Sequence, residues 1–313
     1  MIAVGKRAIA IVGAPSSIGI RPYPTGQARQ LDRAPETLRA LRLAKRLGAV
    51  DMGDVLPPRY RDYIRPQGRA RNEQEVADYC VALGERVAAA TANGRFALVL
   101  GGDCSIVLGS LLGARRTAGG AVGLAYVDAH ADFATPHESR TGSVASMCLG
   151  LAVGRGDTPL ARLGGVAPLV EPEAVVLLGR RDTDQPGYGQ AAMAAFPILD
   201  LPQAALLACG YQEAAALALE RLTSRGLRGF WIHVDADVLD PSDIPAVDSP
   251  EPGGPTPDAL VELLSPLVRH PQALGLELTI YDPGLDPDGS CAVRLADMLE
   301  RLLAASRVEA GVR

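Results

Sequence analysis

Short apolar runs of five to seven residues recur along the chain, and longer segments whose apolar residues have helical spacing lie between them. Such runs are typical of strands buried on both faces, and their alternation with helices favours a mostly parallel sheet covered by helices on both sides. The expected strands are residues 8–12, 96–100, 122–127, 174–178, 229–234 and 274–280. The expected helices are residues 36–47, 73–92, 106–117, 212–224, 257–269 and 292–305, with Thr256 as the N-cap of the fifth. No break in composition separates these elements, so we predict one α/β domain spanning residues 1–313.

The charge balance argues against several classes of partner. The 313 residues carry a formal net charge of -5, which leaves no broad basic surface for nucleic acid or an anionic membrane. No apolar stretch reaches 18 residues, so we expect a cytoplasmic protein without a membrane span. The five cysteines are scattered and lack CxxC spacing, which argues against a disulfide framework or a zinc ribbon and predicts mostly buried thiols.

The apolar run at residues 122–127 is followed directly by Asp128, His130 and Asp132, in the segment AYVDAHADF. Alternate residues of an extended chain project from one face, so two carboxylates and an imidazole would converge there. Buried groups of this kind repel one another or stay unsatisfied unless a cation joins them. The spacing therefore indicates metal ligands; the alternative is a chance pattern on an exposed loop.

A second run, at residues 229–234, ends in the same way. It leads into Asp235 and Asp237, in the segment WIHVDADVLDP. Ligands of parallel sheets gather at the carboxyl ends of the strands, so we expect both acidic segments to form one shared site. Asp240 precedes a proline and is expected to shape the turn, so it is not included among the ligands.

The segment LVLGGDCSIVLGS combines a strand, paired glycines and the start of a helix. Gly101 and Gly102 permit a tight turn or close packing, and Asp103 or Ser105 can cap the helix. Cys104 stands where the strand ends, as a metal ligand would. A glycine-rich turn also suits a phosphate cradle, but the spacing matches neither nucleotide-binding fingerprint.

Together, GGDCS, DAHAD and HVDADVLDP resemble the three metal motifs of the arginase and agmatinase (ureohydrolase) superfamily, in the same order. GRRDTD, which contains Asp182 and Asp184, resembles a fourth segment that recognises the amino-acid end of the substrate. The resemblance covers roughly residues 96 to 283. It implies a three-layer α/β/α sandwich around a mostly parallel, eight-stranded sheet, and assembly as a homotrimer or homohexamer.

Carried over to this chain, the resemblance implies a site for two Mn²⁺ ions. Its ligands would be Cys104, Asp128, His130, Asp132, Asp235 and Asp237, with Asp128 and Asp235 bridging the two ions. Asp132 would also be catalytic, accepting a hydrogen bond from the attacking water and passing its proton to the leaving amine. The implied reaction is metal-assisted hydrolysis of a C–N bond in a guanidine or amidine compound, such as an arginine derivative, agmatine or a guanidino acid, releasing urea or a related product.

Cys104 departs from the family pattern, which usually has histidine at this position. A thiolate favours softer ions, so Zn²⁺ or another divalent ion becomes an alternative to Mn²⁺ at this side of the site. The second interpretation of Cys104 is a neutral buried thiol beside a weakened metal position.

Two further departures concern the substrate. Ala145 aligns with a histidine that shuttles protons, and the nearby His137 either takes over that task or faces water. Ile280 stands where the family has a glutamate that grips the guanidinium. Glu277 lies three residues earlier, an odd step that reverses the face of a strand. Glu277 would therefore bind the substrate only if a bulge changed the register; otherwise it supports the metal ligands from beneath. The resemblance of GRRDTD implies that Asp184 binds the substrate.

Two other functions fit parts of the pattern. A zinc-dependent amide hydrolase or deacetylase would also use Asp and His ligands, but paired bridging carboxylates favour two metals. A non-catalytic metal-binding regulatory protein could keep the fold while lacking the shuttle histidine and the guanidinium glutamate. Against this interpretation, five of the six expected ligands are the family's own residues.

Overall fold

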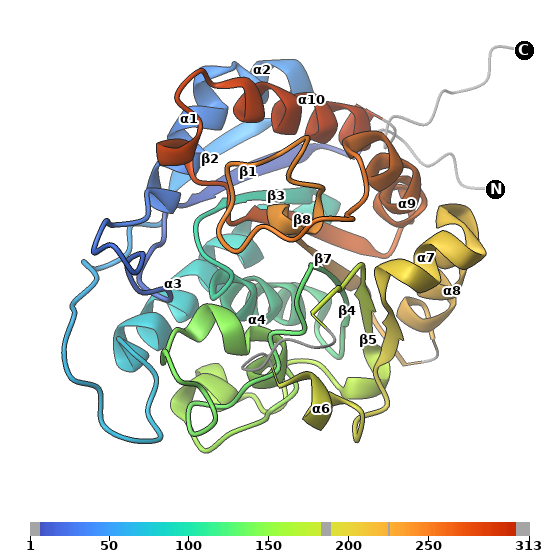
Figure 1. Ribbon diagram of the computed structural model, residues 1–313. Helices are drawn as coiled ribbons and strands as arrows, with labels where there is room; N and C mark the ends of the chain where they lie inside the picture. The colour runs from blue at the N-terminus through green and yellow to red at the C-terminus, as the bar shows by residue number, and fades with distance from the viewer. Residues whose placement is uncertain (1–6, 183–188, 225, 305–313) are drawn as a thin grey trace, which may run out of the picture.

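The central element of the computed structural model is one parallel sheet of eight strands, in the order β2-β1-β3-β8-β7-β4-β5-β6 (Figure 1). The structure describes residues 7–182, 189–224 and 226–304. The strands are β1 (Ile9–Ala14), β2 (Val50–Asp54), β3 (Phe96–Gly101), β4 (Gly123–Val127), β5 (Val175–Leu178), β6 (Leu199–Leu201), β7 (Phe230–Asp235) and β8 (Ala273–Thr279). The predicted parallel sheet and the predicted three-layer fold class are thus confirmed.

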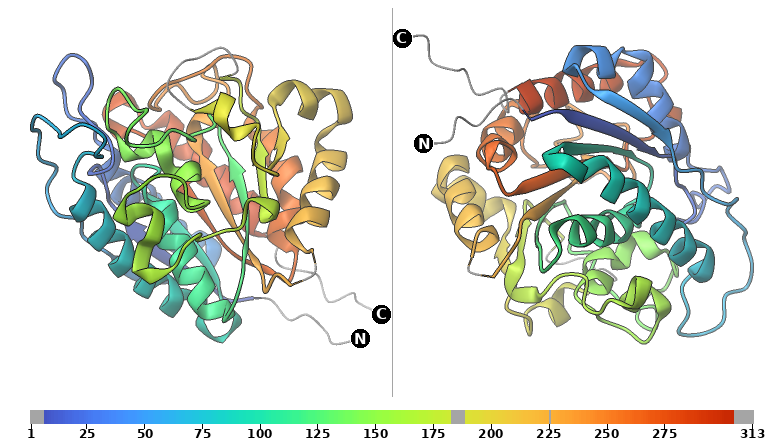
Figure 2. Two further views of the ribbon diagram at one scale, coloured as in Figure 1. Left: turned by 90° about the horizontal axis from the view of Figure 1, so that it is seen from below. Right: turned by 180° about the vertical axis from the view of Figure 1, so that it is seen from behind.

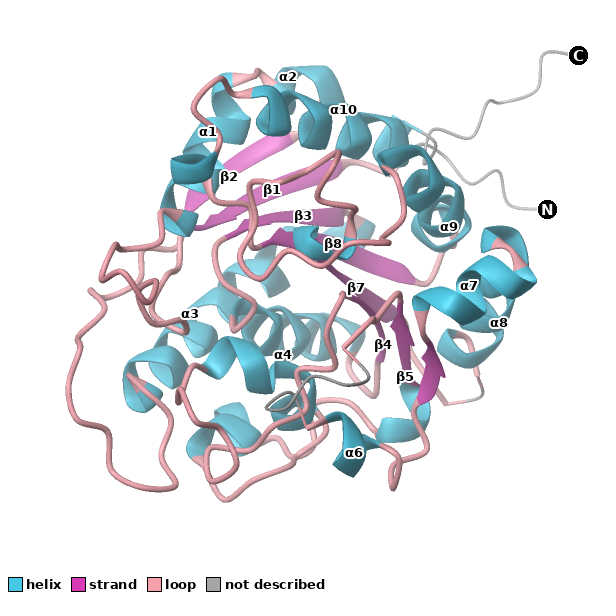
Figure 3. Cartoon of the chain, viewed as in Figure 1, coloured by secondary structure: helices cyan, strands magenta, loops and turns pink. Residues whose placement is uncertain are grey.

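Helices cover both faces of this sheet, as Figures 2 and 3 show. The helices are α1 (Ala34–Ala40), α2 (Leu43–Leu47), α3 (Glu73–Thr91), α4 (Ile106–Ala118), α5 (Cys148–Ala152), α6 (Gln190–Met193), α7 (Gln203–Cys209), α8 (Tyr211–Leu222), α9 (Pro257–Arg269) and α10 (Ser290–Ala304). One layer contains α3 and α4, which pack on each other, and the other contains α8, α9 and α10 together with α1 and α2.

The sequence predicts the six inner and apolar strands but neither edge strand. β2 is exposed or half-buried along its whole length, and β6 has three half-buried residues. An edge strand packs few side chains, so it needs no continuous apolar run. The helix predicted for residues 36–47 is two helices in the structure, because Arg42 takes a left-handed conformation with φ 59° between α1 and α2.

The topology brings the three motif-bearing strands together at the centre of the sheet. β3, β8, β7 and β4 are consecutive neighbours. Since all are parallel, the segments that follow β3, β4 and β7 leave the sheet at the same edge. All five cysteines are free thiols and four of them are buried, as expected. Across the described residues, we find no helix with the length and apolar character that crossing a membrane requires.

The predicted helix cap at Thr256 is present, since its side-chain oxygen accepts a hydrogen bond from the Ala259 amide at 3.2 Å. Replacing Thr256 by Ala leaves that amide without its partner, and we expect a loss of about 1 kcal/mol in the free energy of unfolding. Urea titration followed by circular dichroism measures this change. Glu262→Ala, at an exposed position of the same helix, is the control and should stay within about 0.5 kcal/mol of the parent. Equal effects of both variants would contradict the capping role.

Candidate metal centre

The segment after β4 places three potential ligands in a buried position. Asp128, His130 and Asp132 are 0%, 3% and 5% exposed. The segment is not extended throughout, because Asp132 takes a left-handed conformation with φ 45°. Its side chain therefore does not continue the strand alternation, and instead accepts a hydrogen bond from the Tyr126 hydroxyl at 2.8 Å.

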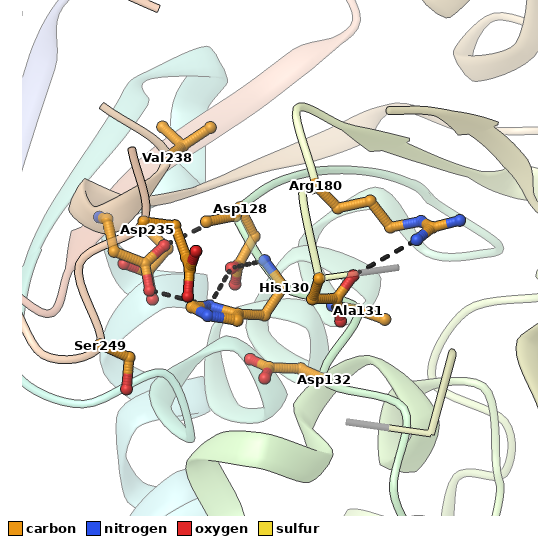
Figure 4. Close-up of polar contacts among 12 residues, drawn as sticks. Asp128, His130, Ala131, Asp132, Arg180, Asp235, Val238 and Ser249 are labelled. Atoms are coloured by element: carbon orange, nitrogen blue, oxygen red, sulfur yellow. Dashed lines mark hydrogen bonds and ion pairs between the residues drawn. The ribbon is translucent and has the colours of Figure 1, made fainter. Parts of the chain in front are cut away.

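The segment after β7 brings its own two carboxylates to the same place. Asp235 ends the strand, and its Oδ1 accepts a hydrogen bond from the Asp237 amide at 2.8 Å, which fixes the turn. Asp237 Oδ1 accepts from the Ala129 amide at 3.2 Å, so β4 and β7 are joined above the sheet. The imidazole Nδ1 of His130 lies 3.0 Å from Asp237 Oδ2 and 3.5 Å from Asp128 Oδ1. Figure 4 shows Asp128 and Asp235 turned toward His130, with Asp132 below them in this view.

The turn after β3 supplies the thiol. Gly102 packs directly on the loop that follows β1. A Cβ added at Gly102 would lie 2.0 Å from the Ser16 carbonyl oxygen, so only glycine fits. Asp103 accepts hydrogen bonds from the Ser16 hydroxyl and the Gly19 amide, which anchors the same loop. Cys104 then reaches the acidic group, and its Sγ donates to Asp235 Oδ2 at 2.6 Å.

These side chains form two groups that could each hold a metal ion. The first contains Cys104, Asp128, His233 and Asp235, and the second contains Asp128, His130 and Asp237. Within each group, one potential ligand atom per residue lies within 4.8 Å of all the others. Asp128 belongs to both groups, as a bridging ligand would. Asp132 belongs to neither, although it lines the pocket beside them.

The electrostatics of the site favour bound cations. Burial and repulsion from neighbouring carboxylates raise the pKa of Asp128, Asp132 and Asp235, the last two well above the usual range. Burial alone would lower the pKa of His130, but Asp237 and Asp128 outweigh it and raise that pKa. Asp128 Oδ2 is buried and has no hydrogen-bond partner among the described residues. A cation would relieve both the mutual repulsion and this unsatisfied oxygen, so the residues present fit metal ions.

The thiol of Cys104 responds to the same environment. Burial, and then the negative charges of Asp235, Asp132 and Asp128, raise its pKa well above the usual value. Without a cation, Cys104 is therefore a neutral thiol. As a metal ligand, Cys104 would be a thiolate, because coordination to a cation favours the deprotonated form; as a residue beside a weakened metal position, it would stay a neutral thiol.

A cavity of about 440 Å³ opens above these side chains. Cys104, His130, Asp132, Asp235 and Asp237 form its floor. Ala145 and Ile280 are apolar parts of its wall, at the two positions where the resemblance places a histidine and a glutamate. Ile280 has a left-handed backbone with φ 65°, which is unusual for a β-branched residue.

The other expected residues lie away from the cavity or outside the described residues. His137 is exposed on its loop and is not part of the cavity wall. Glu277 is fully buried beneath the site, and the pairing of β8 with β3 and β7 has no bulge around it. The geometry therefore supports a role in holding other side chains, not the substrate-binding role considered for Glu277. Asp184 lies outside the described residues, whereas Asp182 is buried and accepts from the Ala131 amide at 2.9 Å.

Comparison with known proteins agrees with the motifs. Residues 7–304 match the sequence profile of the Arginase family. The chain belongs to the arginase family. Arginase from Staphylococcus aureus (strain COL) is 32% identical over 259 residues, which cover 79% of this chain and 81% of that protein. The crystal structure of arginase from Bacillus caldovelox has a TM-score of 0.83 at 28% identity, covering 98% of this chain and 100% of that one. Arginase from Bacillus subtilis gives 0.82 at 26% identity, over 95% and 98%.

Two residues of this arginase-family site were missed in the sequence. His233 and Tyr126 each lie two positions before a carboxylate, Asp235 and Asp128, on the same face of the strand. Both stand inside apolar runs, which by themselves indicate buried strands. Because side chains two residues apart on a strand point to the same face, counting back two residues from each carboxylate identifies both.

We expect Asp128→Asn and Asp235→Asn each to lower the metal content and abolish activity, because each substitution removes a negatively charged ligand, Asp128 from both groups and Asp235 from the first. Elemental analysis of the purified protein and a turnover assay measure the two effects. Glu85→Gln, at an exposed position on α3, should change neither. Normal metal content and turnover in both aspartate variants would refute their role as metal ligands.

Cys104→His should keep or strengthen Mn²⁺ binding, since it replaces a soft donor in a carboxylate-rich site by imidazole. Cys104→Ser should weaken Zn²⁺ binding more than Mn²⁺ binding, because it removes the thiolate but keeps a small side chain. Competition titrations of the two ions measure both shifts. Unchanged affinity and selectivity in both variants would show that Cys104 is not a ligand.

Proposed function

We propose that this chain is a binuclear metal-dependent hydrolase that cleaves a C–N bond of a guanidine or amidine compound. The observation that carries the proposal is the pair of buried ligand groups sharing Asp128 at the floor of a cavity, in a chain of the arginase family. In the overall reaction, water adds to the planar carbon, the amine leaves with a proton, and urea or a related product remains.

The ligand atoms determine which cations would fit. Asp128, His130 and Asp237 offer carboxylate oxygens and one imidazole, which suit Mn²⁺. The group that includes Cys104 adds sulfur and suits Zn²⁺ or another borderline ion as well. When bound, two such cations supply Lewis acidity and lower the pKa of a water at the site.

Asp132 is the residue positioned to transfer protons. Its Oδ2 is occupied by the Tyr126 hydroxyl, so the other carboxylate oxygen remains for a water or the substrate. It lines the cavity without belonging to either ligand group. In this proposal, Asp132 takes the proton released by the attacking water and passes it to the departing nitrogen.

The residues of the cavity wall indicate which chemical group the substrate has at the end away from its guanidine or amidine. Four residues with hydroxyl groups line the wall, namely Ser139, Thr141, Ser143 and Ser146. Exposed Arg21 and Arg140 also line the cavity. Hydroxyls and guanidinium groups bind carboxylates well. An amino-acid derivative or a guanidino acid therefore fits this wall better than agmatine, which has no carboxylate. Asp184 remains the candidate for an amino group.

A non-catalytic metal-binding protein is the second candidate, and the apolar residues Ala145 and Ile280 favour it. Metal analysis together with urea release across a panel of guanidines, guanidino acids and amides separates the candidates. Two bound metals with turnover of guanidines would support the proposal. Metal binding without turnover would support the non-catalytic protein, and turnover of amides alone would indicate an amide hydrolase.

We expect a modified guanidine, such as an N-hydroxylated arginine, to exceed plain arginine in kcat/KM by at least about tenfold, which is some 1.4 kcal/mol. Ile280 offers no carboxylate to an unmodified guanidinium, which forgoes a charged hydrogen bond of about 1.5–3 kcal/mol. If the bond to the hydroxylated nitrogen breaks, the leaving group is hydroxylamine and a substituted urea remains; hydroxylamine is less basic than an alkylamine and depends less on protonation, which Ala145 cannot provide. Parallel kinetics with saturating Mn²⁺ measure the ratio. If arginine is the best substrate, the importance given to these two positions is wrong.

A further inference from the structure

His233 occupies a position next to the candidate metal centre that the motifs do not assign. It lies on β7 two residues before Asp235 and is fully buried. The register pairs it with Tyr126 on β4 and Glu277 on β8. Side chains at paired positions of neighbouring strands point to the same face of a sheet. The three side chains therefore form one row directly beneath the carboxylates.

This row holds the imidazole in a fixed orientation. The Nδ1 of His233 is 2.8 Å from Glu277 Oε1, and the other oxygen of Glu277 accepts from the Ser110 hydroxyl on α4 at 2.5 Å. The Tyr126 ring stacks on the imidazole, with centroids 4.3 Å apart and planes at 22°. In the tautomer in which Nδ1 donates to Glu277 Oε1, Nε2 carries the lone pair. Nε2 is buried and has no hydrogen-bond partner among the residues that the structure describes.

We propose that Nε2 of His233 is a metal ligand, completing the set formed by Cys104, Asp128 and Asp235. The inference rests on the metal centre proposed above and adds a ligand to it. One potential ligand atom from each of these four residues lies within 4.8 Å of the others. Bonds of about 2.0–2.3 Å to one ion place its ligand atoms at most about 4.6 Å apart, so only small adjustments are needed.

The hydrogen bond from Nδ1 to Glu277 is the second reason. Histidines that bind metals almost always donate their other ring nitrogen to a carboxylate or carbonyl, which fixes the tautomer and raises the basicity of the coordinating nitrogen. A histidine with only a packing role would not need an unpartnered nitrogen beside three other potential ligands, because an unsatisfied buried polar atom is unfavourable.

The inferred set changes the character of one metal position. Sulfur, imidazole nitrogen and two carboxylates suit Zn²⁺, Co²⁺ or Cd²⁺, whereas Asp128, His130 and Asp237 suit Mn²⁺. The imidazole that Cys104 does not provide would come from β7, which is separated from β3 by β8. Glu277 then acts as a positioning residue for His233, without touching substrate or metal.

NMR of the full-length protein loaded with a magnetically active cadmium isotope tests the ligand directly. Scalar coupling between imidazole protons and cadmium arises only through a coordinate bond. We expect coupled signals from His130 and His233, and His233→Gln should remove one set. His137→Gln, at an exposed position, is the matched control and should leave both sets. Coupling from His130 alone would overturn this inference and leave the metal centre intact, while absence of cadmium binding would overturn both.

Zinc affinity, measured by competition with a chelator, gives a second readout that does not depend on activity. His233→Gln should weaken one of two binding events by at least about tenfold and leave the other unchanged. Glu277→Gln should weaken the same event by about 10- to 100-fold, as is usual for residues that orient a ligand, while the cadmium coupling to His233 persists. Equal weakening of both events by His233→Gln would indicate a general loss of structure and contradict the assignment.

Discussion

The site depends on one electrostatic constraint, the gathering of four nearly buried aspartates at one edge of the sheet. Asp128, Asp132, Asp235 and Asp237 are at most 5% exposed. Such a concentration of negative charge is unfavourable in a low-dielectric interior unless cations compensate it. The central parallel strands β3, β8, β7 and β4 fix the aspartates in place. The fold therefore holds the ligands together although they repel one another, and metal binding would release that repulsion.

The sequence predicts the parts of this arrangement that repeat regularly. Continuous apolar runs identify the inner strands, and carboxylates at their ends identify Asp128, Asp235 and Asp237. The edge strands β2 and β6 escape prediction because they bury little surface. Asp132 lies differently from the expected alternation because its backbone is left-handed, which no periodicity indicates. His233 is difficult to predict as a site residue because it lies within a mostly apolar strand.

The alternation of side chains along β8 and just beyond it determines which residues lie beneath the metal centre and which line the cavity. Glu277 is paired with His233, and Thr279, two residues further along β8, is paired with Asp235. Ile280, one residue beyond Thr279, lines the cavity above. A carboxylate at 277 and one at 280 would thus serve opposite sides of the same site. This chain has glutamate at position 277 and isoleucine at position 280. The ligands therefore keep their support from Glu277, while the cavity wall is apolar at Ile280.

The left-handed backbone of Ile280 has a consequence for engineering. A β-branched residue in this region costs on the order of 1–2 kcal/mol relative to a relaxed conformation, and glycine or asparagine would tolerate it better. Ile280 contributes its side chain to the cavity wall, so relieving the strain also reshapes that wall. Selection for thermal stability would then favour substitutions of Ile280 that also change the substrate specificity. At position 280, higher stability is therefore gained at the cost of the present specificity.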